Sequence, residues 1–316
     1  MELGHANLEE FASTILELAR QDTSVLVMTS DSRGSARLTQ FGEQLPNQLV
    51  EIGIAEQDLV GIAAGLASCG KKVFAVSPAC FLTARGLEQI KNDVAYSDQP
   101  VKLIGISAGV SYGALGSTHH SLHDFAALRA IHNLTIMAPA DNFETRQTIQ
   151  AICGYPHPVY VRFGKAPLFH LHAPDTAFAI GKAIPIRNGR DLTFVACGET
   201  VSAAAAAAEL LEKDGVSCRV FSMHTIKPLD QDALVEAAQQ TGAIITVEEH
   251  SVCGGLGEAC AAVLLQAGLH TPFKIVGIPD EYTVTGSQSE IFNHYGISPD
   301  GLTQTARQLL FTRTVG

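Results

Sequence analysis

The fold is decided by residues 49–68, LVEIGIAEQDLVGIAAGLAS, in which an extended apolar lead-in delivers a carboxylate to the start of a helix. Apolar residues recur at helical spacing, at Leu59, Ile62 and Leu66, and the other face carries glycine and alanine, so the pattern predicts a buried helix. The carboxylate is Glu56, and its burial is costly unless another group hydrogen-bonds to it. Taken alone, such an acid is more often stabilised by the positive helix terminus than functional.

The composition indicates a folded protein of about two domains. The chain has 316 residues, of which 46% are hydrophobic and 17% charged, and this balance argues against disorder. A net charge of −11 without a Lys/Arg-rich run argues against nucleic acid as a partner. The N-terminus lacks signal-peptide features, no apolar run is long enough to cross a bilayer, and the seven cysteines form no CxxC pair. We therefore expect a cytoplasmic protein with reduced thiols and no membrane segment.

Short, continuously apolar strands alternate with helices along the first half of the chain. Such strands are typical of parallel sheets covered on both faces, so we expect an α/β fold with a mostly parallel sheet between helical layers. The expected strands are 25–28, 73–76, 101–106, 134–137 and 158–163, and the expected helices are 6–20, 84–96, 122–131 and one capped by Asp141 or Asn142.

A second α/β unit follows a linker. Residues 165–178 contain two prolines and no hydrophobic period, and we place the linker at 169–178, between domains 1–168 and 179–316. In the second domain we expect strands at 192–196, 218–222, 243–247 and 273–276, and helices near 200–213, 230–240 and 255–267.

Polar and glycine-rich segments follow the predicted strands of the first domain. Residues 29–35, TSDSRGS, contain Asp31 and Ser35, and a glycine-rich loop occupies 105–116. Because parallel α/β sheets place ligands at the carboxyl ends of their strands, we expect the site at this edge. Arg162 ends an otherwise apolar strand at the same edge, where a structural salt bridge and an anion clamp are equally compatible with its position.

Three further motifs leave their chemistry open when taken alone. The spacing of His119, His120 and His123 could hold a metal, but no local cysteine or further acid completes a known pattern, so a substrate-facing polar loop is favoured. Residues 254–257, GGLG, precede a helix and could bind an anion, although tight packing of the helix start is the better interpretation. Phe81 lies between a strand and a helix, where most aromatic residues belong to the core.

In their order and spacing, these segments resemble the C-terminal half of transketolase-type thiamine diphosphate enzymes. The resemblance covers essentially the whole chain, as a pyrimidine-binding domain followed by the family's C-terminal domain. It rests on GIAEQ at 53–57, GALGSTH at 113–119, MAPAD at 137–141, Val161-Arg162 and VEEHSVCGGLG at 247–257.

The resemblance implies a catalytic role for Glu56. Its carboxyl would donate a hydrogen bond to N1′ of the cofactor's aminopyrimidine, which favours the tautomer that activates the thiazolium carbon. Donation requires a protonated acid at neutral pH, and we expect the apolar helix around Glu56 to provide a low-dielectric pocket that keeps it protonated. Phe81 would stack on the pyrimidine ring, and Ile54 and Asp31 are the other residues that we assign to cofactor binding.

The same resemblance assigns the residues that meet the substrate. His119 corresponds to the substrate-facing, catalytic histidine of the family's Thr-His motif, and Arg162 to the arginine that holds an anionic tail. Ser35 is assigned to the substrate from its place in the first polar loop. The family's usual acid for a substrate hydroxyl is replaced by Leu115, which favours a modified or smaller sugar as substrate.

The diphosphate half of the cofactor site is not found in the sequence. Full-length relatives bind Mg²⁺ and the diphosphate through a Gly-Asp-Gly motif, which these 316 residues lack. The resemblance therefore implies a split enzyme, in which Mg²⁺ and the diphosphate are held by a separate N-terminal transketolase-type subunit. We expect an α2β2 assembly in which this chain also contacts its own copy, and we expect no metal ligands in this chain.

The sequence thus resembles the C-terminal subunit of a split transketolase, which moves a two-carbon ketol unit from a phosphorylated or similarly anionic ketose to an aldose. Three alternatives stay open. The chain could be a deoxyxylulose-phosphate synthase-like or 2-oxoacid dehydrogenase E1 beta-like subunit, or a non-catalytic partner module with the same fold. It could also be a metal enzyme that uses the three histidines.

Overall fold

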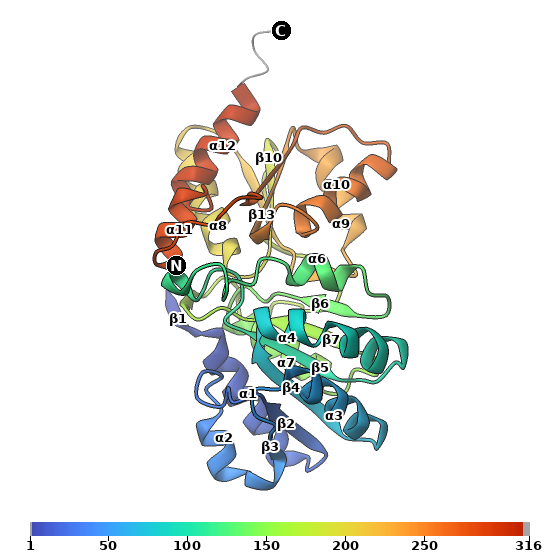
Figure 1. Ribbon diagram of the computed structural model, residues 1–316. Helices are drawn as coiled ribbons and strands as arrows, with labels where there is room; N and C mark the ends of the chain where they lie inside the picture. The colour runs from blue at the N-terminus through green and yellow to red at the C-terminus, as the bar shows by residue number, and fades with distance from the viewer. Residues whose placement is uncertain (1, 312–316) are drawn as a thin grey trace.

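The computed structural model describes residues 2–311, which form two α/β domains stacked end to end (Figure 1). The first domain is built on a seven-stranded sheet and the second on a five-stranded sheet. Helices cover both faces of each sheet, so the expected α/β fold is confirmed.

The sheet of the first domain is parallel except at one edge. Its order is β12-β6-β7-β5-β4-β2-β3, and β12 runs antiparallel to β6. Its strands are β2 (Val25–Thr29), β3 (Leu49–Glu51), β4 (Lys72–Pro78), β5 (Lys102–Ile106), β6 (Thr135–Met137), β7 (Val159–Arg162) and β12 (Thr225–Lys227). The second half of the chain supplies β12, and its three residues carry no periodic pattern that could have predicted this pairing.

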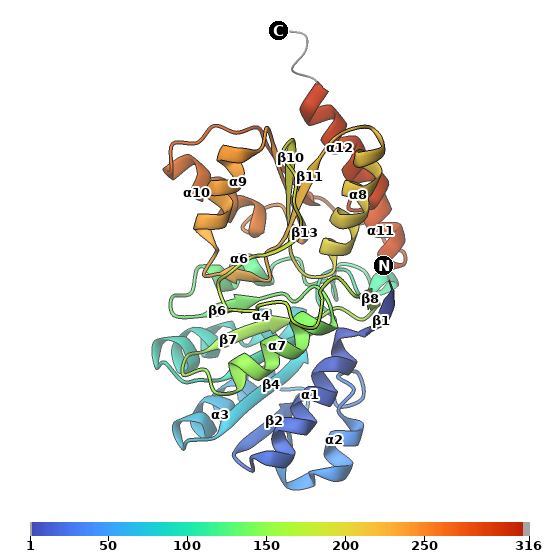
Figure 2. The same ribbon diagram turned by 180° about the vertical axis from the view of Figure 1, so that it is seen from behind.

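Two helical layers enclose this sheet. Figure 2 shows α1 (Asn7–Gln21) and α7 (Asn142–Cys153) on one face, and Asp141 caps α7 by accepting from the Glu144 amide, as expected. The other layer contains α3 (Glu56–Ser68), α4 (Ala79–Arg85), α5 (Leu87–Gln89), the π-helical η2 (Ile90–Tyr96) and α6 (Asp124–Arg129). The expected helix 84–96 is therefore divided into three segments. Short α2 (Thr39–Gln44) and η1 (Pro46–Gln48) precede β3.

The helix α3 is buried on one face only. Leu59 and Ala63 lie in the core, whereas Ile62 is 44% exposed and Gly65 lies on the surface. The prediction of a fully buried helix is wrong for that outer face, because small and apolar residues there are not covered by this chain. An uncovered apolar face on an otherwise well-packed protein is typical of a contact surface.

The second domain repeats the layered plan. Its sheet has the order β14-β13-β10-β11-β9, with β9 antiparallel to β11 and the other pairs parallel. The strands are β9 (Ile184–Arg187), β10 (Leu192–Ala196), β11 (Cys218–Ser222), β13 (Ile244–Ser251) and β14 (Phe273–Ile278). Figure 1 shows α8 (Thr200–Lys213), α11 (Gln288–His294) and α12 (Pro299–Phe311) on one side, and α9 (Gln231–Gln240) and α10 (Leu256–Gln266) on the other.

The expected linker, 169–178, starts at the last residue of a short strand and is held to the first domain by hydrogen bonds and ion pairs. β8 (Pro167–Phe169) pairs with β1 (Leu3–Ala6), and residues 170–178 form no helix or strand. The buried imidazole of His172 lies 2.9 Å from the Asp141 carboxylate and 3.2 Å from that of Glu144. Burial opposes protonation of His172, but these carboxylates outweigh it and raise its pKa to about 9. A protonated histidine thus holds the linker to the start of α7.

The described residues also bear on two expectations from composition. All seven cysteines are free, and four of them are buried. Among the helices of residues 2–311, none is long and apolar enough to cross a membrane.

Candidate active site

The sequence-predicted site residues lie along one edge of the first sheet. The parallel strands β2, β3, β4, β5 and β7 all end there, because parallel strands share their carboxyl ends. The loops and helix starts that follow these strands supply, in chain order, Asp31 and Ser35, Ile54 and Glu56, Phe81, His119 and, at the end of β7, Arg162.

Glu56 is the first residue of α3 and is only 3% exposed. The expected purely apolar pocket is wrong, because Arg85 at the end of α4 places Nη1 2.9 Å from both carboxylate oxygens. The two residues are 29 positions apart, and nothing in the sequence indicates that α4 turns Arg85 toward α3. An ion pair requires the ionised carboxylate, whereas a hydrogen bond donated to a cofactor requires the protonated acid. These two interactions of Glu56 exclude each other.

Arg85 also stacks on Phe81, with its guanidinium carbon 4.4 Å from the ring centroid. The guanidinium is planar and carries N–H groups, and it lies between the Phe81 ring and the Glu56 carboxylate. An open cleft of about 610 Å³ is lined by Ile54, Glu56 and Arg85.

The first polar loop is tied to the loop that carries Ile54. Glu51, at the end of β3, accepts hydrogen bonds from the Asp31 amide at 2.7 Å and the Gly53 amide at 3.0 Å. Asp31 has φ 55° and an exposed side chain. The hydroxyl of exposed Ser35 donates within its own loop, to the Ser32 carbonyl at 3.1 Å. The structure thus ties the Asp31 backbone to the loop that carries Ile54 and leaves Ser35 bonded within the first loop.

His119 packs edge-on against two aromatic rings. Its centroid lies 5.4 Å from that of Phe81 and 5.4 Å from that of Tyr112, and its Nδ1 is 2.9 Å from the Thr118 hydroxyl. The imidazole therefore lies beside the ring on which a cofactor would stack. Exposed Lys165 places Nζ 4.6 Å from the Tyr112 centroid. No motif in the sequence marks Lys165, although its position three residues after Arg162 puts it at the same sheet edge.

The three histidines of the glycine-rich loop do not gather around a common point. His120 Nε2 lies 2.9 Å from the Gly113 carbonyl, and His123 Nε2 lies 3.3 Å from the Thr83 hydroxyl. Within residues 2–311, no group of three His, Cys, Asp or Glu side chains is placed to hold a metal ion. The histidine metal-enzyme alternative therefore has no structural support.

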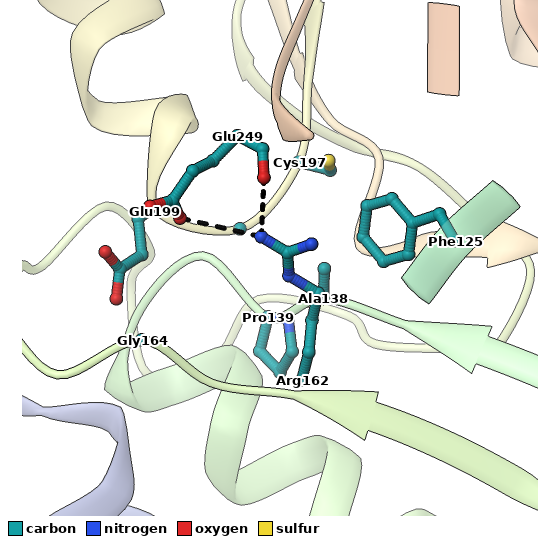
Figure 3. A pocket seen from close by; sticks show the side chains of 9 residues that line it. Phe125, Ala138, Pro139, Arg162, Gly164, Cys197, Glu199 and Glu249 are labelled. Atoms are coloured by element: carbon teal, nitrogen blue, oxygen red, sulfur yellow. Dashed lines mark hydrogen bonds and ion pairs between the residues drawn. The ribbon is translucent and has the colours of Figure 1, made fainter. Parts of the chain in front are cut away.

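Arg162 lies in an ion-pair network between the domains and not in the cleft (Figure 3). It is 6% exposed, its Nη1 lies 3.0 Å from the Asp124 carboxylate, and its Nη2 lies 2.8 Å from the Glu249 carbonyl. The guanidinium also covers the Phe125 ring at 4.5 Å. The cavity beside it measures about 10 Å³, which is enough for roughly one water molecule and far too small for a sugar phosphate. The structure therefore shows the salt bridge, and the assignment of Arg162 to the substrate stays a prediction.

Two carboxylates of this network lie on either side of Gln288. Its Nε2 donates to Glu199 at 2.6 Å and to Glu249 at 2.8 Å. Burial, and next the charge of Glu249, raise the pKa of Glu199 to about 8. Burial also raises the pKa of Glu249, although Arg162 opposes this. The network therefore keeps a carboxyl protonated near neutral pH and avoids two adjacent buried negative charges.

The GGLG motif packs a helix against its strand. Glu248 accepts from the Leu256 amide at 2.6 Å and the Gly257 amide at 2.8 Å, which caps α10. A Cβ on Gly255 would lie 1.9 Å from the Glu248 carboxylate, so only glycine fits. Because Glu248 already occupies the helix terminus, the favoured packing interpretation is confirmed over anion binding.

The fold and the cleft together define a two-domain α/β protein with an open cleft beside a buried acid that is paired with an arginine. Comparison with known families is more specific. The family described as "Transketolase, pyrimidine binding domain" matches residues 6–169, and "Transketolase, C-terminal domain" matches residues 181–302. The chain belongs to the transketolase family.

Relatives of similar length are separate subunits. The chain is 49% identical over 303 residues to one subunit of the apulose-4-phosphate transketolase of Phocaeicola vulgatus, with 96% of each covered. It is 32% identical to 6-deoxy-6-sulfo-D-fructose transketolase subunit SqwH of Clostridium sp., covering 95% of this chain and 93% of the relative. A solved split gene transketolase, described as an inactive beta4 tetramer, shares 33% identity with a TM-score of 0.88 and covers 97% of this chain and 98% of its own. Over nearly its whole length the chain is thus similar to subunits of split transketolases.

Proposed function

We propose that this chain and an N-terminal subunit form an enzyme that transfers a two-carbon ketol unit from an anionic ketose to an aldose with thiamine diphosphate. The observation that supports this most is the flat space between Glu56 and Phe81, which already accommodates a planar N–H-bearing group. When bound, thiamine diphosphate supplies the nucleophilic carbon that carries the ketol unit. The N-terminal subunit would hold Mg²⁺ and the diphosphate, since this sequence lacks a Gly-Asp-Gly motif.

Within this proposal, the chain's own residues bind one half of the cofactor. Phe81 stacks on the pyrimidine ring, and Glu56, once released by Arg85 and protonated, donates to N1′. Exposed Ile54 and Asp31 border the ring from the neighbouring loops. Exclusion of water by the partner subunit would strengthen the hydrogen bond from Glu56.

His119 and Lys165 are the residues proposed to meet the sugar. His119 can exchange a proton with a substrate oxygen, and Lys165 can pair with an anionic group near Tyr112. Ser35, from the first loop, is also proposed to contact the substrate. Leu115 is exposed on the same loop as His119, where it offers an apolar contact in place of an acid for a hydroxyl. Apulose 4-phosphate is the first donor to test, because two relatives carry its name, at 49% and 36% identity.

The assembly is proposed to be α2β2, in the cytoplasm. Exposed Ile54 lines the cleft two residues before the start of α3, and exposed Ile62 lies in the middle of this helix. A partner that covers both residues also closes the cleft over Glu56. The site would then form between chains, in agreement with an N-terminal subunit that supplies the other half.

The test is co-expression with a subunit that contains Gly-Asp-Gly, followed by a ketol-transfer assay with apulose 4-phosphate and with 6-deoxy-6-sulfo-D-fructose. We expect thiamine diphosphate-dependent turnover that is lost in Glu56→Gln while the complex still assembles. Glu236→Gln, on α9 of the second domain, is the matched control and should keep full activity. Full activity of Glu56→Gln, or cofactor-dependent activity of this chain alone, would contradict the proposal.

A second candidate activity comes from one further relative. The chain is 36% identical to 1-deoxy-D-xylulose-5-phosphate synthase of Heliobacterium modesticaldum over 95% of its length, although it spans only 46% of that protein. The same complex should therefore be assayed for formation of 1-deoxy-D-xylulose 5-phosphate. Formation of this product without ketol transfer would favour the synthase-like alternative.

A further inference from the structure

The loop that carries His119 is held from the second domain at three points. This loop spans residues 107–121, follows β5 of the first domain and is closed by a β-bridge between Gly109 and Ser121. The contacts fall near its start, its middle and the residues beside His119. They come from β13 and from the segment 283–288 that leads into α11.

We propose that Thr283 and Glu249 are positioning residues for His119, which fix the shape of this loop from the second domain. Both act on the loop, whereas the His119 ring packs against Phe81 and Tyr112 of the first domain. The inference rests on the proposed function, because His119 is the substrate-facing residue of that site. The second domain supplies none of the residues that line the cleft. The inference nevertheless gives this domain a role in the reaction.

The first point of attachment is the carboxylate of Glu249. Its Oε1 accepts from the Val110 amide at 2.8 Å, and Gln288 donates to the same oxygen at 2.8 Å. Gly109 has a φ of +60°, and a Cβ there would lie 2.1 Å from the Glu249 carboxylate carbon. Only glycine allows this approach, so the carboxylate and the loop start are fixed against each other.

The second point is a backbone contact in the middle of the loop. Gly113 has a φ of +51°, and a Cβ there would lie 2.6 Å from the Gly286 carbonyl oxygen. The Gly113 carbonyl lies 2.9 Å from His120 Nε2, which connects the middle of the loop to the residue after His119. The two glycines thus let the loop pack directly on the second domain.

The third contact is made to residues on both sides of His119. The Thr283 hydroxyl lies 2.7 Å from the Ser117 hydroxyl and 3.5 Å from His120 Nδ1. These are the residues two before and one after His119. A hydroxyl that holds both flanks restricts the backbone on which the imidazole is carried, without touching the imidazole itself.

Other contacts, away from the loop, also hold the two domains together. Lys227 donates to the Arg129 carbonyl at 3.1 Å, Arg129 donates to the Gly255 carbonyl at 2.8 Å, and β12 extends the first sheet. Loss of the Thr283 hydroxyl should therefore leave the domains together. This separates a positioning role from a merely structural one.

The test is Thr283→Val, which keeps the shape of the side chain and removes its hydroxyl. Hydrogen exchange of the free chain should show faster exchange of amides 111–120, by about fivefold or more, because exchange reports local opening. In the assembled enzyme, kcat should fall about tenfold with KM changed less than about twofold, as expected for loss of transition-state alignment. Glu249→Gln retains an oxygen that can accept from Val110, and it should restore most of the exchange protection that Glu249→Ala loses.

Ser287→Ala is the matched control. Ser287 lies in the same segment, but its hydroxyl bonds to Glu290 and Ser289 as the cap of α11. It should lower the melting temperature slightly and leave exchange of 111–120 unchanged. Unchanged loop exchange in Thr283→Val, or an equal increase in Ser287→Ala, would overturn the inference. If the unsubstituted complex shows no ketol transfer, the proposed function fails, while the exchange comparison still decides whether the second domain fixes the loop.

Discussion

Arg85 Nη1 lies 2.9 Å from each carboxylate oxygen of Glu56, and the same guanidinium stacks on Phe81. The pair compensates a carboxylate that would otherwise be a buried, unpaired charge. A cofactor ring that stacks on Phe81 and bonds to Glu56 needs the same space, so Arg85 must move before the ring can enter. The side chain of Arg85 is 48% exposed and borders the open cleft, which gives it room to do so.

Replacing Arg85 should destabilise the free chain through Glu56. We expect Arg85→Met to lower the free energy of unfolding by about 1–2 kcal/mol, less than for a fully buried pair because Arg85 is half exposed. Adding Glu56→Gln should restore most of this loss, because no charge is then left unpaired. Urea unfolding of the single and double variants near neutral pH measures the coupling.

Arg307→Met is the matched control, because it breaks an ion pair with Asp214 in which both side chains are exposed. Its effect should stay below about 1 kcal/mol. Additive effects of Arg85→Met and Glu56→Gln would show that the two side chains are not coupled in solution.

His172, in the linker, should make the stability of the chain fall at alkaline pH. The pKa of His172 rises from 6.5 to about 9 on folding, so its contribution is fully present below pH 6.5 and is lost as pH rises through about 9. The difference corresponds to up to about 3 kcal/mol. Urea unfolding at pH 6.5, 8 and 9.5 should show a decline in the wild type and a smaller decline in His172→Gln, in which the ionisation of Glu199 near pH 8 still lowers stability.

His157→Gln serves as the comparison, because His157 pairs with Asp98 where both side chains are about half exposed. It should leave the alkaline decline intact. If His172→Gln and the wild type lose stability in parallel, another group controls the alkaline limb.

The layered fold follows from the sequence because continuous apolar runs form buried parallel strands. The expected strands at 192–196 and 218–222 match β10 and β11 to the residue, since each is bounded by polar turns. Strand β12 could not be predicted, because a three-residue strand from the second half joins the first sheet through tertiary contact alone.

From the sequence, only those site residues could be predicted that a local pattern of neighbouring residues marks. Glu56 is marked by its place before an apolar helix, and Phe81 and His119 by their places after strands. Arg85 contacts Glu56 across 29 residues, and Thr283 contacts Ser117 across 166. A hydrophobic period describes near neighbours in the sequence, so it could not predict either pair. Arg162 shows the same limit, since strand position left its salt bridge and its clamp equally open.

The tight start of α10 should not tolerate a side chain. Gly255→Ala would place a Cβ 1.9 Å from the Glu248 carboxylate, and we expect it to lower the free energy of unfolding by about 1–3 kcal/mol. Gly65→Ala on α3 has no atom within 4 Å of the new Cβ and should be neutral or stabilising by up to about 1 kcal/mol. Thermal unfolding of the free chain compares them. If the two substitutions changed stability equally, the packing at GGLG would be able to accept a Cβ with little loss of free energy.

Replacing Arg162 should lower the stability of the chain more than it affects substrate binding. Arg162→Met leaves Asp124 and Glu249 buried without their cation, so we expect a loss of about 3–5 kcal/mol in the free energy of unfolding. Adding Asp124→Asn should recover part of it. A variant that unfolds normally but has a strongly raised KM for the anionic donor would instead support the anion clamp.

Lys165 should show the opposite pattern, because it is exposed and its Nζ lies over the Tyr112 ring. In the assembled enzyme, Lys165→Met should raise KM for a phosphorylated donor by about tenfold, which corresponds to about 1.4 kcal/mol, and leave the melting temperature of the free chain unchanged. The wild-type KM should rise with salt, and this dependence should weaken in the variant, since an exposed charge pair is screened. Lys213→Met on α8 of the second domain is the charge-matched control and should change neither KM nor its salt dependence. An unchanged KM in Lys165→Met, beside a normal loss of turnover in Glu56→Gln, would show that the anionic end of the donor is held by the N-terminal partner and not by this chain.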